Sequence, residues 1–292
     1  MAKKIKGWTL NKFSQFKLFL KKVVEILMRP EMAVLPGQLA FFIILSFVPI
    51  ITLFGAVANI LGLSMSSISS FINGIFPNVD LSLSTTTFDP STMSISLIII
   101  FVIMFYIASN GANSLIITSN EIYGIKQSNL FKRRFKAILM TILFVILYIF
   151  ILVVPLLGTK ILETVNYFNI KSFIMPLIPF VKGPLTWIII FGFIRLIYSI
   201  APDRLMPNAR VYSGALFTTF GWIVATAIFS KFIEHNTTYN IYYGSLSGIA
   251  TLMLWVYILS FIFVMGMSLN YRAEKEKLEK TGIITINNED NI

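Results

Sequence analysis

The sequence predicts an all-α integral membrane protein with six transmembrane helices, and three observations support this prediction. Hydrophobic residues make up 56% of the 292 residues and charged residues only 13%, whereas a soluble domain carries about 25% charged residues. Six apolar runs approach or exceed the roughly 20 residues that cross a hydrocarbon core. The positive charges lie at the ends of these runs, as the positive-inside rule expects.

Counting Lys and Arg by connection fixes the predicted orientation. Of the 24 Lys and Arg residues, 19 fall in segments predicted to be cytoplasmic and 4 in segments predicted to be external, with Arg195 alone inside a span. This asymmetry places both termini in the cytoplasm. The transmembrane domain covers 33–271, and a charged cytoplasmic tail, expected to be solvated and frayed, covers 272–292. The predicted spans are 33–63, 94–118, 137–157, 184–201, 211–232 and 245–271.

Residues 1–32 are predicted to form a basic amphipathic helix on the cytoplasmic side. Apolar residues recur in steps of three and four, which places them on one helical face, and lysines fall among them. Such a helix suits the headgroup layer of an anionic leaflet, either as an anchor beneath the bundle or as a lipid sensor. The apolar residues are Phe13, Phe16, Leu20, Val23 and Leu27.

Prolines and loop composition refine the spans. Pro49 should kink the first span, and Pro184 should start the fourth as a favourable first-turn residue. That helix should end before Pro202, because the residue preceding a proline avoids the helical region. Residues 64–93 read as an external loop with a short interfacial helix at 66–76. The apolar piece 173–180 is expected in the outer interface or as a re-entrant segment.

Composition also excludes several classes of function. There is no cysteine and a single histidine, His235, so neither a thiolate site nor a His-carboxylate metal cluster is expected, and we predict no cofactor. The net charge of +11 raises the possibility of nucleic-acid binding, but membrane topology explains the distribution of the charges better. We therefore expect a protein that is not an enzyme and does not bind nucleic acid.

Polar residues inside the spans indicate where a site should lie. A rise of about 1.5 Å per residue puts Arg195 roughly 16 Å below the outer start of its span. Asn110 by the same count lies deeper, about 24 Å down, with Asn113 beyond it, and Gln38 reaches a similar level from the inside. An arginine at this depth costs about 2.5 to 3.5 kcal/mol unless it faces a partner helix or a wet cavity.

This placement motivates the hypothesis of a polar cavity open toward the cytoplasm or inner leaflet, with Arg195 at its deepest point. Its ligand would be an anionic lipid headgroup or another amphiphilic anion, since guanidinium groups suit phosphate and carboxylate. The alternative is structural: Arg195 caps backbone carbonyls or pairs with Asn113 or Glu121. The candidate binding residues are Arg195, Asn110, Asn113, Gln38, Glu121, Arg133, Arg134, Arg204 and Arg210.

Several stretches of the chain resemble the YihY/BrkB family of bacterial inner-membrane proteins. The resemblance covers roughly 30–270 and implies a six-helix protein of the cytoplasmic membrane, linked to envelope functions and suspected of moving lipids or other amphiphiles. Some members have carried the name ribonuclease BN. The matching residues are Leu39, Ala40, Phe41, Phe42, Leu45, Ser46 and Pro49; Asn120, Ile122, Tyr123 and Gly124; Pro207, Arg210, Gly214 and Ala215; and Tyr243, Gly244, Ser245, Trp255, Tyr257, Gly266 and Asn270.

Two classes of function follow. The protein is a membrane transporter or flippase for lipids or other amphiphiles, or it is a non-transporting membrane scaffold or envelope-assembly partner. Metal-dependent RNA hydrolysis needs clustered His and carboxylate ligands, and before the tail the inside loops offer only Glu121 and Asp203, which argues against the ribonuclease name. A channel would need rings of charge that the chain does not show. The oligomeric state is left open by the sequence.

Overall fold

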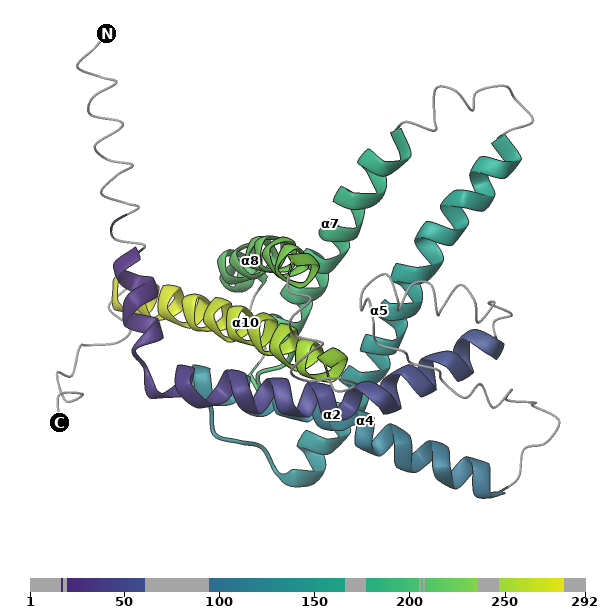
Figure 1. The fold of residues 1–292 in the computed structure, drawn as a ribbon. Helices are drawn as coiled ribbons and strands as arrows, with labels where there is room; N and C mark the ends of the chain where they lie inside the picture. Colours follow the sequence, from purple (N-terminus) through teal and green to yellow (C-terminus); the bar gives the residue numbers. More distant parts are fainter. Residues whose placement is uncertain are drawn as a thin grey trace, which may run out of the picture.

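The computed structural model describes residues 17, 20–60, 95–165, 177–204, 206, 208–235 and 247–280, and the regular secondary structure in these residues is entirely helical. Long apolar segments form helices because only a helix satisfies every backbone N–H and C=O within lipid without a sheet partner. The six long helices, labelled in Figure 1, are α2 (Pro30–Ile60), α4 (Ile95–Tyr123), α5 (Leu130–Val165), α7 (Leu177–Ile200), α8 (Asn208–His235) and α10 (Ser247–Lys280).

Three helical segments in these ranges are long and apolar enough to cross a membrane: Val102–Tyr123, Arg210–Ile233 and Gly248–Glu276. A fourth span results if the short helix Leu20–Leu27 and the segment Pro30–Ser46 are taken together, although they meet at 74°. Pro184–Ile200 is a shorter apolar helix. The described residues therefore show an all-helical protein with three or four spans of the six predicted.

The prolines act partly as expected. Pro36 and Pro49 both lie inside α2, and Figure 1 shows that α2 changes direction in its second half, which contains Pro49. The helix α7 ends at Ile200, before Pro202. It begins at Leu177, however, so the prediction that Pro184 starts this helix is wrong. A proline inside a membrane helix is tolerated because neighbouring helices re-satisfy the freed backbone carbonyl.

Two predicted features lie partly or wholly outside the described residues. The external loop 64–93, with its interfacial helix at 66–76, lies outside them entirely. Of the apolar piece 173–180, residues 177–180 form the first turn of α7.

The last helix, α10, continues past 271 to Lys280, so the first part of the predicted tail is helical. In this part of the helix, Glu274 is only 8% exposed.

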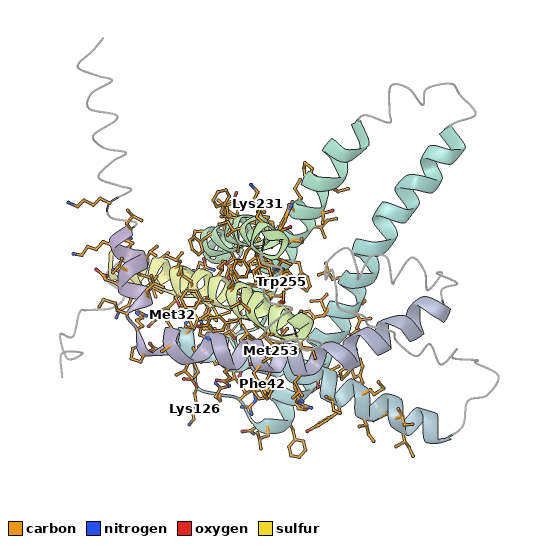
Figure 2. The ribbon with its side chains drawn as sticks, viewed as in Figure 1. Met32, Phe42, Lys126, Lys231, Met253 and Trp255 are labelled. Carbon is orange, nitrogen blue, oxygen red and sulfur yellow. The ribbon has the colours of Figure 1, made fainter. Side chains whose placement is uncertain are left out.

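The core lies where α10 packs between α2 and α8, with α4 against α2 and α7 against α8. Figure 2 shows side chains crowded between these helices, including those of Met32 and Trp255. The hydroxyl of the fully buried Tyr198 lies 2.6 Å from Thr218 Oγ1 and donates to the carbonyl of Phe263 at 2.7 Å. These bonds tie α7, α8 and α10 together.

Two glycines allow α8 and α10 to approach closely. A Cβ on Gly266 would lie 2.0 Å from Thr218 Oγ1, and a Cβ on Gly214 would lie 2.1 Å from the carbonyl oxygen of Gly266. At Gly221, also on α8, a Cβ would lie 2.6 Å from a methyl group of Ile262 on α10. Small residues of this kind are what let membrane helices pack backbone to backbone.

The short helix Leu20–Leu27 stands across the ends of α2 and α10 (Figure 1). Ile26 is fully buried against the bundle, whereas four apolar side chains on another face are exposed. An exposed apolar face beside lysines is what a headgroup-layer helix presents. Of the predicted apolar face, Phe13 and Phe16 lie outside the described residues. The exposed side chains are Leu20, Val24, Leu27 and Met28.

Candidate functional site

Two arginines of α5 reach two asparagines of α4. Arg134 donates from Nη1 to Asn110 Oδ1 at 2.9 Å, and Arg133 donates from Nε to Asn113 Oδ1 at 3.2 Å. Asn110 and Asn113 lie three residues apart on α4, so they project from nearly the same helical face. The structure thus brings together four of the nine predicted site residues, which we call the arginine–asparagine pairs.

Arg134 is held by more than its asparagine. Its Nη2 donates to the carbonyl of Tyr106 at 2.7 Å, and its guanidinium carbon lies 3.5 Å from the centroid of the Tyr106 ring. A guanidinium stacked on an aromatic ring is stabilised by the ring quadrupole. Its Nε is buried and has no hydrogen-bond partner among the described residues. Arg134 is therefore fixed in position with donor capacity unused.

The acceptors in these pairs are all neutral. Among the described residues, no carboxylate forms an ion pair with Arg133 or Arg134, whereas Lys136, two residues further along α5, pairs with Asp203 at 3.2 Å. A neutral amide satisfies hydrogen bonds but leaves the full positive charge in place. The arginine–asparagine pairs are consequently a centre of uncompensated positive charge.

Exposed aromatic residues flank this charge. Phe131 is 93% exposed, Phe135 65% and Tyr106 55%. Aromatic side chains are enriched at the level of the lipid headgroups, where one part of the ring contacts hydrocarbon and another part contacts water. The combination of stacked arginine, amides and exposed rings is therefore chemically suited to a phosphate-bearing amphiphile at the membrane surface.

Arg195 lies elsewhere. Its guanidinium carbon is 6.0 Å from the ring centroid of Tyr212 on α8, and its Nε is buried without a partner among the described residues. It makes no hydrogen bond to Asn113 or Glu121 within that part of the chain, so the structural pairing envisaged for it is not formed. The structure also does not join it to Asn110 and Asn113, because α7 packs mainly against α8 whereas α4 packs against α2 and α5.

The remaining predicted residues have other neighbours. Arg204 and Arg210 both reach Glu274 of α10; Arg204 Nη2 lies 3.6 Å from its carboxylate, and Arg210 Nη1 is hydrogen-bonded to it. Glu121 is exposed and accepts a hydrogen bond from Gln127 Nε2 at 3.3 Å. Gln38 is half-buried in α2. Within the described part of the chain, none of these four residues forms a hydrogen bond or ion pair with the arginine–asparagine pairs.

Sequence reasoning missed a second polar cluster, centred on Asp203, which joins the α4–α5 loop to the loop after α7. Asn120 Nδ2 donates to Asp203 Oδ2 at 2.8 Å, and Ser128 N donates to the same oxygen at 3.0 Å. Lys136 Nζ lies 3.2 Å from Asp203 Oδ1 and also donates to the carbonyls of Ala201 and Pro202. The signal available in the sequence was an acid, Asp203, and a lysine, Lys136, in two segments both predicted to be cytoplasmic.

The Asp203 carboxylate is stabilised in its charged form. Burial by itself raises the pKa of Asp203, but hydrogen bonds from Ser128, Asn120 and Lys136 outweigh burial and hold the pKa below its ordinary value. Burial lowers the pKa of Lys136, which Asp203 opposes. The local backbone supports this cluster, because Gly124 at φ +60° closes α4 in a Schellman motif, with Ile125 N donating to Asn120 O at 2.8 Å.

A comparison with known protein families shows to which family the chain belongs. The model of the family described as virulence factor BrkB matches residues 24–283. The chain belongs to the BrkB family. The resemblance found in the residues is thereby confirmed, and the match covers the arginine–asparagine pairs, the Asp203 cluster and Arg195 alike.

Three relatives illustrate the family. "Putative ribonuclease-like protein YfkH" of Bacillus subtilis is 27% identical over 249 residues, which is 82% of this chain and 90% of the relative. A UPF0761 membrane protein of Pseudoalteromonas translucida is 28% identical over 140 residues, 46% of each chain. Another, of Idiomarina loihiensis, is 27% identical over 112 residues, 38% of this chain and 37% of the relative. No solved structure matches this BrkB-family chain.

The described segments of this BrkB-family member contain no group of three or more His, Cys, Asp or Glu side chains placed to hold a metal ion. The two acids of the inside loops are occupied otherwise, since Asp203 is bound by Asn120 and Lys136 and Glu121 by Gln127.

Proposed function

We propose that this BrkB-family protein is a transporter or flippase for anionic lipids or other amphiphilic anions in the cytoplasmic membrane of a bacterium. We include in the proposal the six-span topology with both termini in the cytoplasm. The observation that carries it is the set of arginine–asparagine pairs, in which Arg133 and Arg134 are held by neutral acceptors only, beside exposed aromatic side chains.

The chemistry of these pairs supports an anionic ligand. Charged hydrogen bonds from guanidinium to phosphate or carboxylate are about twice as strong as neutral ones, and Arg134 is already oriented by Asn110 and Tyr106. Binding to a pre-oriented donor avoids much of the cost of immobilising a flexible side chain. A lipid phosphate arriving beside the exposed Phe131 would meet a positive charge that no carboxylate in the described segments neutralises.

Arg195 supports the transport part of the proposal. Like Arg133 and Arg134, it has no ion-pair partner among the described residues, and it lies within the apolar helix Pro184–Ile200. An arginine inside a membrane span usually faces the bundle interior or a water-filled cavity, and such residues mark substrate pathways. Under the proposal, Arg195 is a second position at which an anionic headgroup is held, deeper than the first.

The alternative is a scaffold or envelope-assembly partner that transports nothing. The close packing of α8 on α10 at Gly214 and Gly266, and the buried Tyr198 bonds across three helices, favour it. A scaffold needs a rigid bundle and has no use for a fixed, uncompensated arginine at the headgroup layer. We therefore rank transport first.

We also propose that the protein is not an enzyme, in contrast to what the name of the YfkH relative suggests. Purified chain should leave a labelled single-stranded RNA intact in the presence of Mg²⁺, Mn²⁺ or Zn²⁺. Cleavage that co-purifies with the chain and is lost on changing Asp203 or Glu121 would contradict this part of the proposal.

Reconstitution into liposomes tests the transport function. The vesicles carry a fluorescent phosphatidylglycerol in both leaflets, and dithionite added outside quenches only the outer leaflet. If the protein transports lipid, dithionite should quench nearly all of the fluorescence in vesicles with protein and about half of it in vesicles without protein. Fluorescent phosphatidylcholine should be quenched more slowly than phosphatidylglycerol. Equal quenching with and without well-folded protein, for both lipids, would favour the scaffold.

A further inference from the structure

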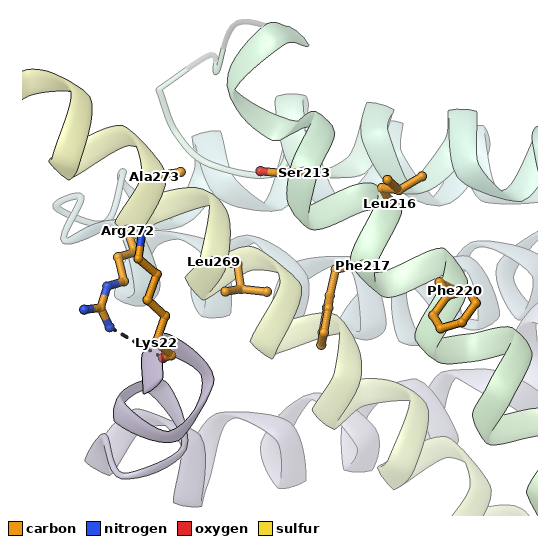
Figure 3. A pocket seen from close by; sticks show the side chains of 8 residues that line it. All are labelled: Lys22, Ser213, Leu216, Phe217, Phe220, Leu269, Arg272 and Ala273. Carbon is orange, nitrogen blue, oxygen red and sulfur yellow. Dashed lines mark hydrogen bonds between the residues drawn. The ribbon is translucent and has the colours of Figure 1, made fainter. Parts of the chain in front are cut away.

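We propose that the groove between α8 and α10 binds one anionic phospholipid, with an acyl chain along its apolar wall and the phosphate at Lys22 and Arg272. The groove has a volume of about 560 Å³, within the roughly 300–1,000 Å³ of small-molecule sites. Figure 3 shows its wall, formed by Leu216, Phe217 and Phe220 of α8 with Leu269 of α10, and its basic end at Lys22 and Arg272. This site is separate from the arginine–asparagine pairs.

The surroundings of the groove identify an acyl chain as its occupant. Both walls belong to candidate membrane spans, Arg210–Ile233 and Gly248–Glu276. Leu216 is 53% exposed and Phe220 67% exposed. In a bilayer, an open apolar groove of this kind is filled by lipid chains rather than by water, because exposing hydrocarbon to water costs about 25 cal/mol per Å².

The two cations at the end of the groove are paired with Glu276 and Glu25 but keep hydrogen-bond donors for an anionic headgroup. Lys22 donates to Glu276 at 2.7 Å, which uses one of its three hydrogens. Arg272 pairs with Glu25 and makes only long contacts, of 3.5 Å, to Glu276 and to the carbonyl of Lys22. The five donors of a guanidinium exceed these contacts, so a phosphate oxygen can be bound without first breaking the ion pairs.

The short helix Leu20–Leu27 completes the site. It contributes Lys22 to the basic end, places Glu25 against Arg272, and presents Leu20, Val24 and Leu27 on an exposed apolar face. A headgroup bound by Lys22 and Arg272 would therefore connect this helix to α10 through the lipid as well as through protein ion pairs. Glu25 competes with the phosphate for the same guanidinium.

Native mass spectrometry of the full-length protein tests this assignment, with phosphatidylglycerol and phosphatidylcholine titrated in separate arms. Arg272→Gln should weaken retention of one phosphatidylglycerol about tenfold, the value of one charge-assisted hydrogen bond. Glu25→Gln should strengthen it several-fold, because the competing carboxylate is removed. Leu216→Trp should abolish it by filling the groove, whereas Ile228→Trp, equally exposed on α8 but outside the groove, should not.

The outcomes separate this site from the proposed function. Arg134→Gln should leave the groove lipid in place, so loss of lipid movement with retained groove binding, or the reverse, tells the two proposals apart. Equal retention of both lipids, or unchanged phosphatidylglycerol retention in a folded Leu216→Trp protein, would overturn the assignment. If Arg272→Gln does not fold, the opposite sign expected for Glu25→Gln still decides, since a purely structural ion pair predicts no gain in lipid binding.

Discussion

The side chain of Asn120 holds Asp203 from two directions. Its Nδ2 donates to the carboxylate at 2.8 Å, and its Oδ1 accepts the backbone N–H of Asp203 at 2.8 Å. Asn120 is fully buried at the end of α4, and Asp203 lies in the loop that leads from α7 to α8. One amide thus fixes how two helix pairs meet at the cytoplasmic side of the proposed topology.

Removing this amide should destabilise the protein. Asn120→Ala deletes a two-way bond to a charged, partly buried group, and we expect a loss of about 2 to 3 kcal/mol. Thermal unfolding in detergent, followed by intrinsic fluorescence, measures the effect. Lys126→Ala, an exposed change in the adjoining loop, should leave the midpoint unchanged. A midpoint for Asn120→Ala equal to that of Lys126→Ala would contradict this role.

The same cluster predicts a dependence on pH. Because the pKa of Asp203 is lower in the folded protein than its ordinary value, its stabilisation is present above the unfolded pKa of about 4 and disappears as the pH falls through the folded pKa. Wild-type protein should keep a constant unfolding midpoint from pH 7 to 5 and lose stability below about pH 4.

Asp203→Asn isolates this contribution from the other carboxylates. The variant should be less stable than wild type at pH 7, and the difference between the two should shrink as the pH approaches 3. A constant difference across this range would show that Asp203 is not the titrating group.

The crossing of α8 and α10 predicts a sharp contrast between two glycines. Gly266→Ala would force a methyl group to within 2.0 Å of Thr218 Oγ1, and overpacking of this kind costs about 1 to 3 kcal/mol or more. At Gly192 a Cβ would meet nothing within 4 Å, so Gly192→Ala should be neutral or gain up to about 1 kcal/mol. Unfolding midpoints in detergent compare them; similar values would refute the close crossing.

The absence of cysteine makes the six-span topology directly testable. A single cysteine at Lys126, between α4 and α5, should react with a membrane-impermeant maleimide only after the cells are permeabilised. A cysteine at Lys231, near the end of α8, should react in intact cells. Reaction of both positions from the same side would rule out the proposed orientation.

Position along a helix was predictable from the sequence, whereas neighbours were not. Residue counting along apolar runs placed Asn110 and Asn113 on one helix, and α4 carries both of them. Counting gives position along a helix axis and says nothing about which helix lies alongside. Arg195 was therefore grouped with the asparagines, although it lies by Tyr212, and the partners Arg133 and Arg134 were expected only at the mouth of a cavity.

Of the helix ends of α7 and α10, one was predictable from the local sequence and the other was not. The stop before Pro202 follows from local sterics, and the structure agrees. The end of α10 does not follow from local signals, because Arg272 to Lys280 alternate in charge like a solvated tail. Tertiary contacts determine where α10 ends, because Glu274 forms ion pairs with Arg204 and Arg210, and Glu276 forms an ion pair with Lys22. Long-range ion pairs of this kind are not visible in a local pattern.

The initial rate of phosphatidylglycerol movement in liposomes containing Arg134→Gln tests the central claim most directly. Lys132→Gln, a neighbouring exposed cation with no ion pair among the described residues, is the matched control. Loss of a charge-assisted hydrogen bond to the phosphate predicts a rate about tenfold below wild type for Arg134→Gln and a wild-type rate for Lys132→Gln. A wild-type rate in a correctly inserted Arg134→Gln protein would contradict the account.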